Sequence, residues 1–362
     1  MAIDISQLNY VPTLGVKVSE MNALEKLPNA TKDLIQPLFL LAPWVSSKNL
    51  DSAIKRIEKA FEERPFFLDI DRYYWPGTNL SPAKQEWIKL LSPKNNYANW
   101  ISFLRELPNA NPCVQIHDVD ISGLEQQTNE LLALDRSIAF RFELVRLPVN
   151  FDQIVEMITR LETANHVIMV DGGWTKNDLD TRLKLMNIVT QKLRDINPDI
   201  PIVVSYTTMP ESYTDVQGTK FTPFNNREVV EEIRQISNRP NIIYGDWGST
   251  RPRSEGDDER RRASPRIDIA TPRGWFSARN SKEHWDYPDA ASTILNSSEW
   301  EQIGHEPIWG IERIKQTADS QKWGIHTPQQ NVTARINIHL HIQALYDGKN
   351  ISPIDFDEDW KD

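Results

Sequence analysis

The chain has 362 residues, a length that α/β barrels reach as single domains. Hydrophobic residues make up 39% of it, which is enough for one sizeable core. Its formal net charge of −10 argues against broad nucleic-acid binding and against binding to anionic membranes, because both need a surplus of lysine and arginine. The single cysteine, Cys113, cannot form an internal disulfide, and neither a signal peptide nor a membrane-spanning apolar run is visible, so we expect a cytoplasmic protein.

Short apolar runs alternate with longer amphipathic stretches along most of the chain. Most of the short runs are almost continuously apolar, which is typical of parallel strands that are covered on both faces. The predicted strands, in chain order, are Tyr10–Lys17, Ile35–Leu41, Phe66–Ile70, Cys113–His117, Ile138–Glu143, Val167–Asp171, Ile202–Tyr206 and Ile242–Asp246.

The stretches between these runs carry apolar residues at helical spacing on one face, which is the pattern of helices that pack against a sheet. The predicted helices are Leu50–Glu62, Gly123–Leu134, Phe151–Leu161, Leu179–Leu193, Val229–Ile236 and Val332–Leu345. This alternation predicts an α/β fold, a closed (β/α)₈ barrel of the TIM type. An open doubly wound sheet is the alternative, but the turn after the first strand lacks the G-x-G-x-x-G pattern that such sheets usually carry.

The regular pattern stops after Asp246. We therefore predict one barrel over residues 1–348, with an insertion at 249–327 between the eighth strand and the last helix, and an acidic tail at 349–362. Within the insertion, Arg266–Ala270 is a candidate strand and Trp300–Lys315 is a candidate helix. The arginine-rich stretch 251–266 is either a solvated loop or a basic lid over the barrel mouth.

Polar residues stand at the ends of most predicted strands, and barrel enzymes place their sites where these ends converge. Side chains alternate between faces along a strand, so Asp69 and Asp71 share a face, as do Arg141 and Glu143. The candidate catalytic residues at this mouth are Lys17, Asp69, Asp71, His117, Glu143, Asp171 and Asp246.

Two chemical roles are open to this ring of side chains. Asp69, Asp171 and Asp246 could hold Mg²⁺ or Mn²⁺, which prefer oxygen ligands, in a phosphohydrolase or a nucleotide-processing enzyme. A carboxylate or His117 could instead act as a general base, with Lys17 as an electrophile.

The same charges could equally close the barrel without any catalysis. Lys17 could pair with Asp246 across the first and last strands, and Arg141 could pair with Asp171. A structure in which the acidic side chains are each held by an arginine or a lysine would count against a metal site.

Four tryptophans follow predicted strand ends and could stack on a ligand or anchor a protein partner, although tryptophan is more often part of a core. Together with arginines near the same ends they form the candidate set for ligand or partner binding: Trp44, Arg72, Trp75, Arg141, Trp174, Trp247, Arg251 and Arg253. Residues 245–251 span the end of the eighth strand and the turn after it, where many barrels bind phosphate, so a phosphate-containing small molecule is a candidate ligand. The acidic Asp246 in this turn counts against phosphate.

Several segments of the sequence together match the pattern of one known protein family. The opening segment is the most specific of them, because a first strand that ends in lysine and a second strand with a Pro-Leu motif follow at a fixed distance. The segments are Tyr10–Lys17 (YVPTLGVK), Ile35–Leu40 (IQPLFL), Phe67–Asp71 (FLDID), His166–Asp171 (HVIMVD) and the late pair Trp275-Phe276. Together these segments resemble the Beta protein family, which is named for a protein of a phage satellite, and the resemblance extends over most of the chain.

This resemblance implies more about biological context than about chemistry. The satellite locus that gives the family its name also holds a toxic gene and a small regulator, and it is linked to the exclusion of other phages. By this resemblance the chain is expected to bind, and to restrain or assist, a toxic or phage-encoded protein partner that is encoded nearby. The family offers no established catalytic residues that could be transferred to this sequence.

Overall fold

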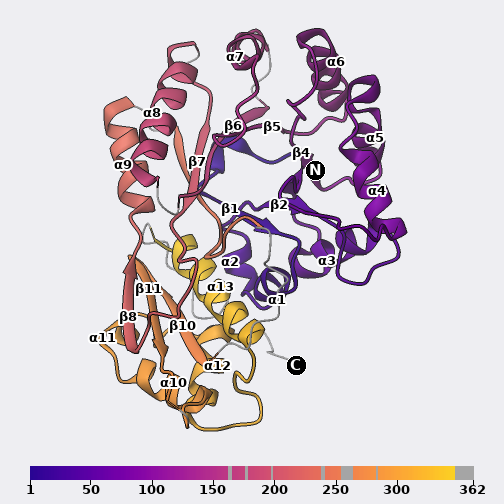
Figure 1. Ribbon diagram of the computed structural model, residues 1–362. Coiled ribbons are helices and arrows are strands. Elements are labelled where there is room, and N and C mark those ends of the chain that lie inside the picture. Colours follow the sequence, from indigo (N-terminus) through magenta and orange to yellow (C-terminus); the bar gives the residue numbers. More distant parts are fainter. Residues whose placement is uncertain are drawn as a thin grey trace.

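The computed structural model describes residues 1–161, 165–175, 178–196, 199–237, 241–253, 264–282 and 284–346. Of the arginine-rich stretch it covers only 251–253 and 264–266, so the choice between a solvated loop and a lid lies outside the described residues, as does the predicted acidic tail. Within the described residues, a barrel of parallel strands is joined to a smaller antiparallel sheet (Figure 1).

Eight parallel strands form the barrel: β1 (Tyr10–Gly15), β2 (Leu38–Leu41), β3 (Phe66–Ile70), β4 (Ala110–Pro112), β5 (Ile138–Glu143), β6 (His166–Trp174), β7 (Ile202–Thr207) and β9 (Ile242–Asp246). They are hydrogen-bonded in the order β4-β3-β2-β1-β9-β7-β6-β5. A parallel bridge between Cys113 and Ala139 joins the two ends of this sheet. The predicted (β/α)₈ barrel is confirmed.

The fourth strand lies earlier in the chain than the predicted Cys113–His117. The cause is a change of partner just after β4. The amide of Cys113 donates to the carbonyl of Leu68 on β3, whereas the next amide, that of Val114, donates to the carbonyl of Ala139 on β5, both at 2.8 Å. The chain therefore crosses from one neighbour to the other within two residues and closes the barrel without forming a long ladder there.

Ten helices surround the barrel in the described part of the chain. They are α1 (Val18–Glu25), α2 (Asn29–Lys32), α3 (Asp51–Phe61), α4 (Pro82–Leu90), α5 (Lys94–Arg105), α6 (Ile121–Leu132), α7 (Phe151–Thr159), α8 (Leu179–Ile196), α9 (Asn226–Ser237) and α13 (Pro328–Ala344). The six predicted helices are present as α3, α6, α7, α8, α9 and α13. None of the described helices combines the length and the apolar composition that crossing a bilayer requires.

Side chains of the barrel strands divide between an inner and an outer core. The inner core contains Val11, Leu38, Phe67, Ala139, Val167, Met169, Val203 and Ile243, and the N-terminal segment around the 3₁₀ helix η1 (Ile5–Gln7) adds Ile3 and Ile5. Alternate residues of the same strands, such as Tyr10 and Phe39, face the helices. Because side chains alternate along a strand, Asp69, Arg141 and Asp171 continue the inner row toward the mouth of the barrel.

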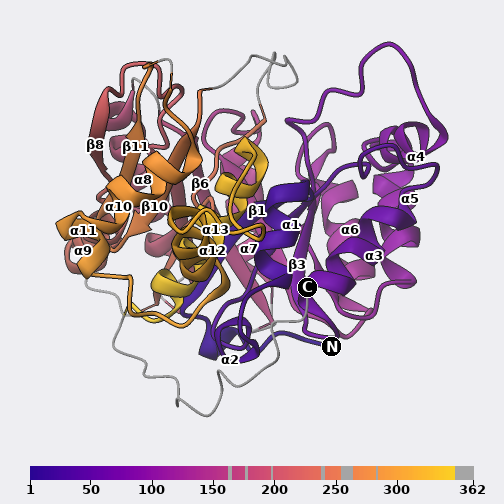
Figure 2. The ribbon, with the colours of Figure 1, turned by 90° about the horizontal axis from the view of Figure 1, so that it is seen from below.

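A second sheet and three more helices pack beside the barrel. The strands β8 (Gly218–Pro223), β10 (Arg266–Thr271) and β11 (Gly274–Arg279) are antiparallel, in the order β10-β11-β8. Strands β10 and β11 share a hydrophobic core with α10 (Tyr287–Leu295), α11 (Ser298–Glu301) and α12 (Trp309–Ala318). Helix α13 lies between this sheet and the barrel (Figures 1 and 2).

This second sheet only partly matches the sequence-based expectation for the region after β9. The candidate strand Arg266–Ala270 is present as β10. The candidate helix Trp300–Lys315 is two helices, α11 and α12, separated by residues 302–308. Strand β8 was not predicted, because its residues are mostly exposed and polar and form no apolar run. The sheet therefore uses the segment between β7 and α9 as well as the segment after β9.

Candidate functional site

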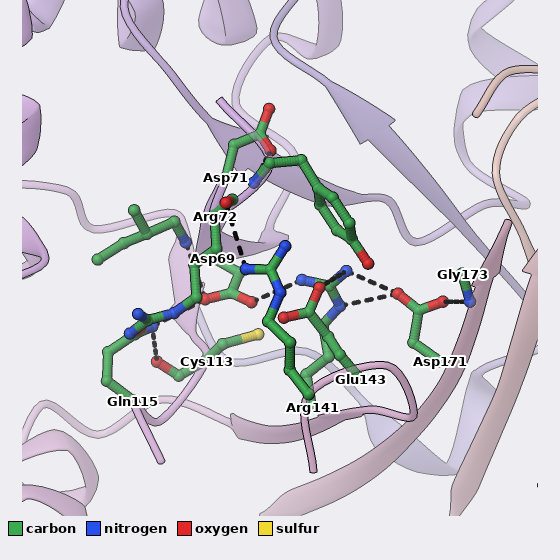
Figure 3. Close-up of polar contacts among 12 residues, drawn as sticks. Asp69, Asp71, Arg72, Cys113, Gln115, Arg141, Glu143, Asp171 and Gly173 are labelled. Atoms are coloured by element: carbon green, nitrogen blue, oxygen red, sulfur yellow. Dashed lines mark hydrogen bonds and ion pairs between the residues drawn. The ribbon is translucent and has the colours of Figure 1, made fainter. Parts of the chain in front are cut away.

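The centre of the barrel mouth is an ionic cluster around the buried side chain of Arg141 on β5 (Figure 3). Its Nη1 atom lies 3.0 Å from Oδ2 of Asp69 on β3, and its Nη2 atom lies 2.6 Å from Oδ2 of Asp171 on β6. The same Nη2 atom lies 3.1 Å from Oε1 of Glu143. The predicted pair of Arg141 and Asp171 is confirmed, and the cluster ties three barrel strands together.

Further N–H groups occupy the second oxygen of two of these carboxylates. Oδ1 of Asp69 accepts a hydrogen bond from the side-chain amide of Gln115 at 2.8 Å. Oδ1 of Asp171 accepts from the indole of Trp247 at 3.1 Å and from the amide of Gly173 at 2.8 Å. A metal ion at these carboxylates would have to displace such donors. Among the described residues, no three or more His, Cys, Asp or Glu side chains are grouped so that they could hold a metal ion.

Asp246 lies on the other side of its strand, outside the ionic cluster. Along β9 the inward position is taken by Ile243, and alternation turns Asp246 outward, toward α13. Its carboxylate accepts hydrogen bonds from the hydroxyls of Tyr10 and Tyr244, both at 2.8 Å, and lies 2.7 Å from Nε2 of His339. Burial opposes its ionisation, but the pairing with His339 and these hydrogen bonds hold the pKa of Asp246 below its usual range.

The structure therefore separates residues that the sequence had grouped. Asp69 and Asp171 meet at Arg141, but Asp246 does not join them, so the predicted metal set does not converge. The predicted pair of Lys17 and Asp246 is wrong. Nζ of Lys17 lies 3.4 Å from Oε1 of Glu20 in the first turn of α1, because Lys17 follows the end of β1 while Asp246 faces the helix layer.

Glu143 is the third carboxyl of the cluster and is buried beside Arg141. Burial raises the pKa of Glu143, although Arg141 and Arg146 favour its ionised form. Beside it lies Tyr73, whose ring centroid is 4.4 Å from the guanidinium carbon of Arg146 and 5.9 Å from the ring centroid of Trp247. Burial and the charge of Glu143 raise the pKa of the Tyr73 hydroxyl. Tyr73 and Arg146 were not predicted, because they lie in loops beyond the strand ends, where alternation gives no signal.

Three further predicted residues surround this cluster. Oδ2 of Asp71 accepts a hydrogen bond from Nε of Arg253 at 2.8 Å. Nη2 of Arg72 donates to the side-chain oxygen of Gln115 at 2.9 Å. His117 is half-buried, and burial together with the nearby Arg72 lowers its pKa to about 4, so the imidazole is neutral at neutral pH. Four acidic residues of the mouth are thus paired with an arginine: Asp69, Asp71, Glu143 and Asp171.

The four predicted tryptophans differ in their surroundings. Trp247 is buried inside the barrel. Trp174 has the guanidinium carbon of Arg251 at 4.6 Å from its ring centroid. Trp44 is partly buried against the outer core. Trp75, in the loop after β3, is 75% exposed and is the most exposed of the four, since Trp44 and Trp174 are partly buried.

Comparison with known proteins gives two matches that agree with each other. A family model described as Beta protein matches residues 10–344, from the first residue of β1 to the last residue of α13. The chain is also similar to Protein beta of Enterobacteria phage P4, with 28% identity over 352 residues. That alignment covers 95% of this chain and 95% of the phage protein. Both matches include the barrel and the second sheet.

Proposed function

The chain belongs to the Beta protein family, and from this membership we propose that it is a barrel protein of an anti-phage defence locus that binds, and restrains or assists, a toxic or phage-encoded protein partner. A relative in phage P4 that aligns along 95% of its own length supports a role in the biology of phages. The candidate partners are the products of the neighbouring genes, and the expected compartment is the cytoplasm.

The observation that carries the binding part of this proposal is an exposed apolar surface on the loops around the barrel mouth. Trp75, in the loop after β3, is 75% exposed, and Val145 and Val149, in the loop after β5, are 45% and 108% exposed. The two loops touch, because Nη1 of Arg146 donates to the carbonyl of Arg72 at 3.2 Å. We call Trp75, Val145 and Val149 the rim. Exposed apolar side chains next to arginines are typical of protein-binding surfaces.

The alternative function, a divalent-metal phosphohydrolase or a nucleotide-processing enzyme, has less support. N–H donors already occupy the carboxylates of Asp69 and Asp171, and Asp246 faces α13, so these residues do not fit Mg²⁺ or Mn²⁺. Titration with Mn²⁺ distinguishes the two functions. Binding by the wild type that is lost in an Asp69→Asn/Asp171→Asn double variant would favour the enzyme.

The binding proposal is tested by calorimetric titration of the full-length protein with each purified product of a neighbouring gene. Trp75→Ala is expected to raise the Kd for the partner about tenfold or more, because a tryptophan buried in an interface commonly contributes about 2 kcal/mol. Trp323→Ala is the matched control, since it removes an indole that is 53% exposed between α12 and α13, away from the rim. If Trp75→Ala binds as the wild type does, the rim is not the binding surface.

A further inference from the structure

A cavity of about 860 Å³ lies between the barrel mouth and the second sheet. Its walls come from the first turn of α1, the loop between β7 and β8, the segment after β9, the ends of β10 and β11, and the first turns of α13. None of the described residues that line it belongs to the rim. The cavity is therefore a second candidate site, separate from the proposed partner surface and from the Arg141 cluster.

Positive side chains outnumber negative ones on the described lining of this cavity by five to two. The positive ones are Lys17, Arg251, Arg266, Arg279 and Arg335. The negative ones are Glu20 and Glu211. Asp268, buried behind the lining, pairs with Arg266 at 2.7 Å and with Arg335 at 2.9 Å, and counting it still leaves five positive charges against three negative ones. This local excess contrasts with the net charge of −10 of the whole chain.

Two of these cations have weak or uncharged partners. Nζ of Lys17 lies 3.4 Å from Oε1 of Glu20 and 3.4 Å from the carbonyl of Arg251, both at the long end of polar contacts. Nη1 of Arg279 donates to two backbone carbonyls of the β7–β8 loop at 3.2 and 3.0 Å, and neither carries a formal charge. Lys17 is thus held only by long contacts, and the close hydrogen bonds of Arg279 are to neutral groups, although the carboxylate of Asp215 also interacts with Arg279 through space. Both cations can therefore contact an anion in the cavity.

We propose that this cavity binds a small molecule that carries a diphosphate or triphosphate group. Its volume is within the range of small-molecule sites, roughly 300–1,000 Å³. Arginine and lysine are the side chains that most often neutralise phosphate oxygens, and Ser19, Ser212 and Thr250 bring hydroxyl groups to the same lining. A phosphate chain would offset the excess of positive charge that side chains of the barrel and of the second sheet place around this cavity.

The first test titrates the full-length protein with sodium pyrophosphate, ADP and adenosine by calorimetry. Pyrophosphate and ADP are expected to bind, and their affinity should fall as salt is added, because ions screen contacts between phosphate and exposed cations. Adenosine, which lacks phosphate, is expected not to bind. Absence of binding by both phosphate compounds, or equal binding by adenosine, would overturn the proposal.

Substitutions in the lining then test whether pyrophosphate binds in this cavity. Lys17→Gln is expected to raise the Kd for pyrophosphate about tenfold, which is the usual effect of losing one charge-assisted hydrogen bond. Lys322→Gln is the matched control, because Lys322 lines a different cavity of about 350 Å³, and it should bind as the wild type does. Arg279→Gln should weaken binding as well, with its melting curve recorded because Arg279 also anchors the β7–β8 loop. An unchanged Kd in Lys17→Gln, or an equal rise in Lys322→Gln, would contradict the assignment.

Discussion

Arg141 is a single buried cation among three carboxylates, with Asp69 and Asp171 at 3.0 and 2.6 Å and Glu143 at 3.1 Å. Removing one partner of a buried ionic group costs far more free energy than the pair itself contributes, because the remaining charges lose their compensation. The arginine therefore holds β3, β5 and β6 in register at the mouth. Its removal leaves negative charges close together in the interior of the barrel.

We expect Arg141→Met to lower the free energy of unfolding by about 3–5 kcal/mol, as is usual for a broken buried ion pair. Urea denaturation followed by circular dichroism measures this change. Arg105→Met is the control, because Arg105 is half-exposed and pairs with Glu130 at 3.3 Å on the surface, where such pairs contribute about 1 kcal/mol or less. Similar losses in both variants would show that the Arg141 cluster does not hold the strands together.

His117 predicts a specific pH dependence of stability. Burial and Arg72 lower its folded-state pKa to about 4, whereas the ordinary pKa of a histidine in an unfolded chain is 6.5. Between these two values the unfolded chain binds a proton that the folded chain resists, so stability is lost as the pH falls through this window. Between about pH 7 and pH 4.5, the free energy of unfolding of His117→Asn should therefore fall by about 1–2 kcal/mol less than that of the wild type. Urea denaturation at each pH measures this difference. Parallel losses in both proteins would contradict this assignment.

At the residue scale, the alternation of side chains between the two faces of a strand predicted which residues face the barrel interior. It did not predict which of these residues contact each other. Asp69 and Arg141 were correctly placed at the mouth from their positions on β3 and β5. Asp246 was grouped with them only because it ends its strand, although Ile243 already marks the inward row of β9. Partners across strands depend on the stagger of the barrel, which no single strand encodes.

At the element scale, α13 links the two sheets. His339 lies 2.7 Å from Asp246 of β9, and Arg335, one turn earlier in the helix, lies 2.9 Å from Asp268 of β10. His341 contacts Thr31 at 2.8 Å, so the two histidines point to different elements, as their spacing predicts. Helix α13 is thus buried between the barrel and the second sheet, and its side chains make polar contacts with both.

Asp246→Asn tests this link. The substitution keeps the shape of the side chain but removes the negative charge that pairs with His339, and it places an amide where Tyr10 and Tyr244 now donate. We expect a loss of about 2–4 kcal/mol in the free energy of unfolding. Thermal melting checks this against Asp152→Asn, whose exposed pair with Lys192 should matter little. A melting temperature equal to that of the wild type would show that the link is dispensable.

The elements that the sequence predicted are those with a clear physical pattern. Buried parallel strands read as continuous apolar runs, and the helices that cover them show one apolar stripe, so most of the barrel follows from the sequence. Strand β8 carries no such run, because its side chains are mostly exposed and, among the described strands, it pairs with β11 alone. The shift of β4 arises from its change of partner between β3 and β5, which is a property of barrel closure.

At the scale of the whole molecule, two separate surface features are candidate binding sites, one apolar and one positively charged. The rim presents apolar side chains on loops around the barrel mouth, and the cavity beside the second sheet collects positive charge in a chain that is acidic overall. Neither feature was visible as a motif, since each combines segments that lie far apart in the sequence. Family membership is the basis of the proposed biological setting, and these two surfaces are the proposed binding sites.

Plaque formation by challenging phages on cells that carry the complete locus tests the central proposal most directly. The locus with the wild-type gene should reduce plaque formation. A locus that encodes Trp75→Ala should lose about tenfold or more of that protection, because this variant binds the partner more weakly. A locus that encodes Trp323→Ala should retain the protection. Full protection with Trp75→Ala at equal protein levels, or no change when this gene is deleted, would contradict the proposed role.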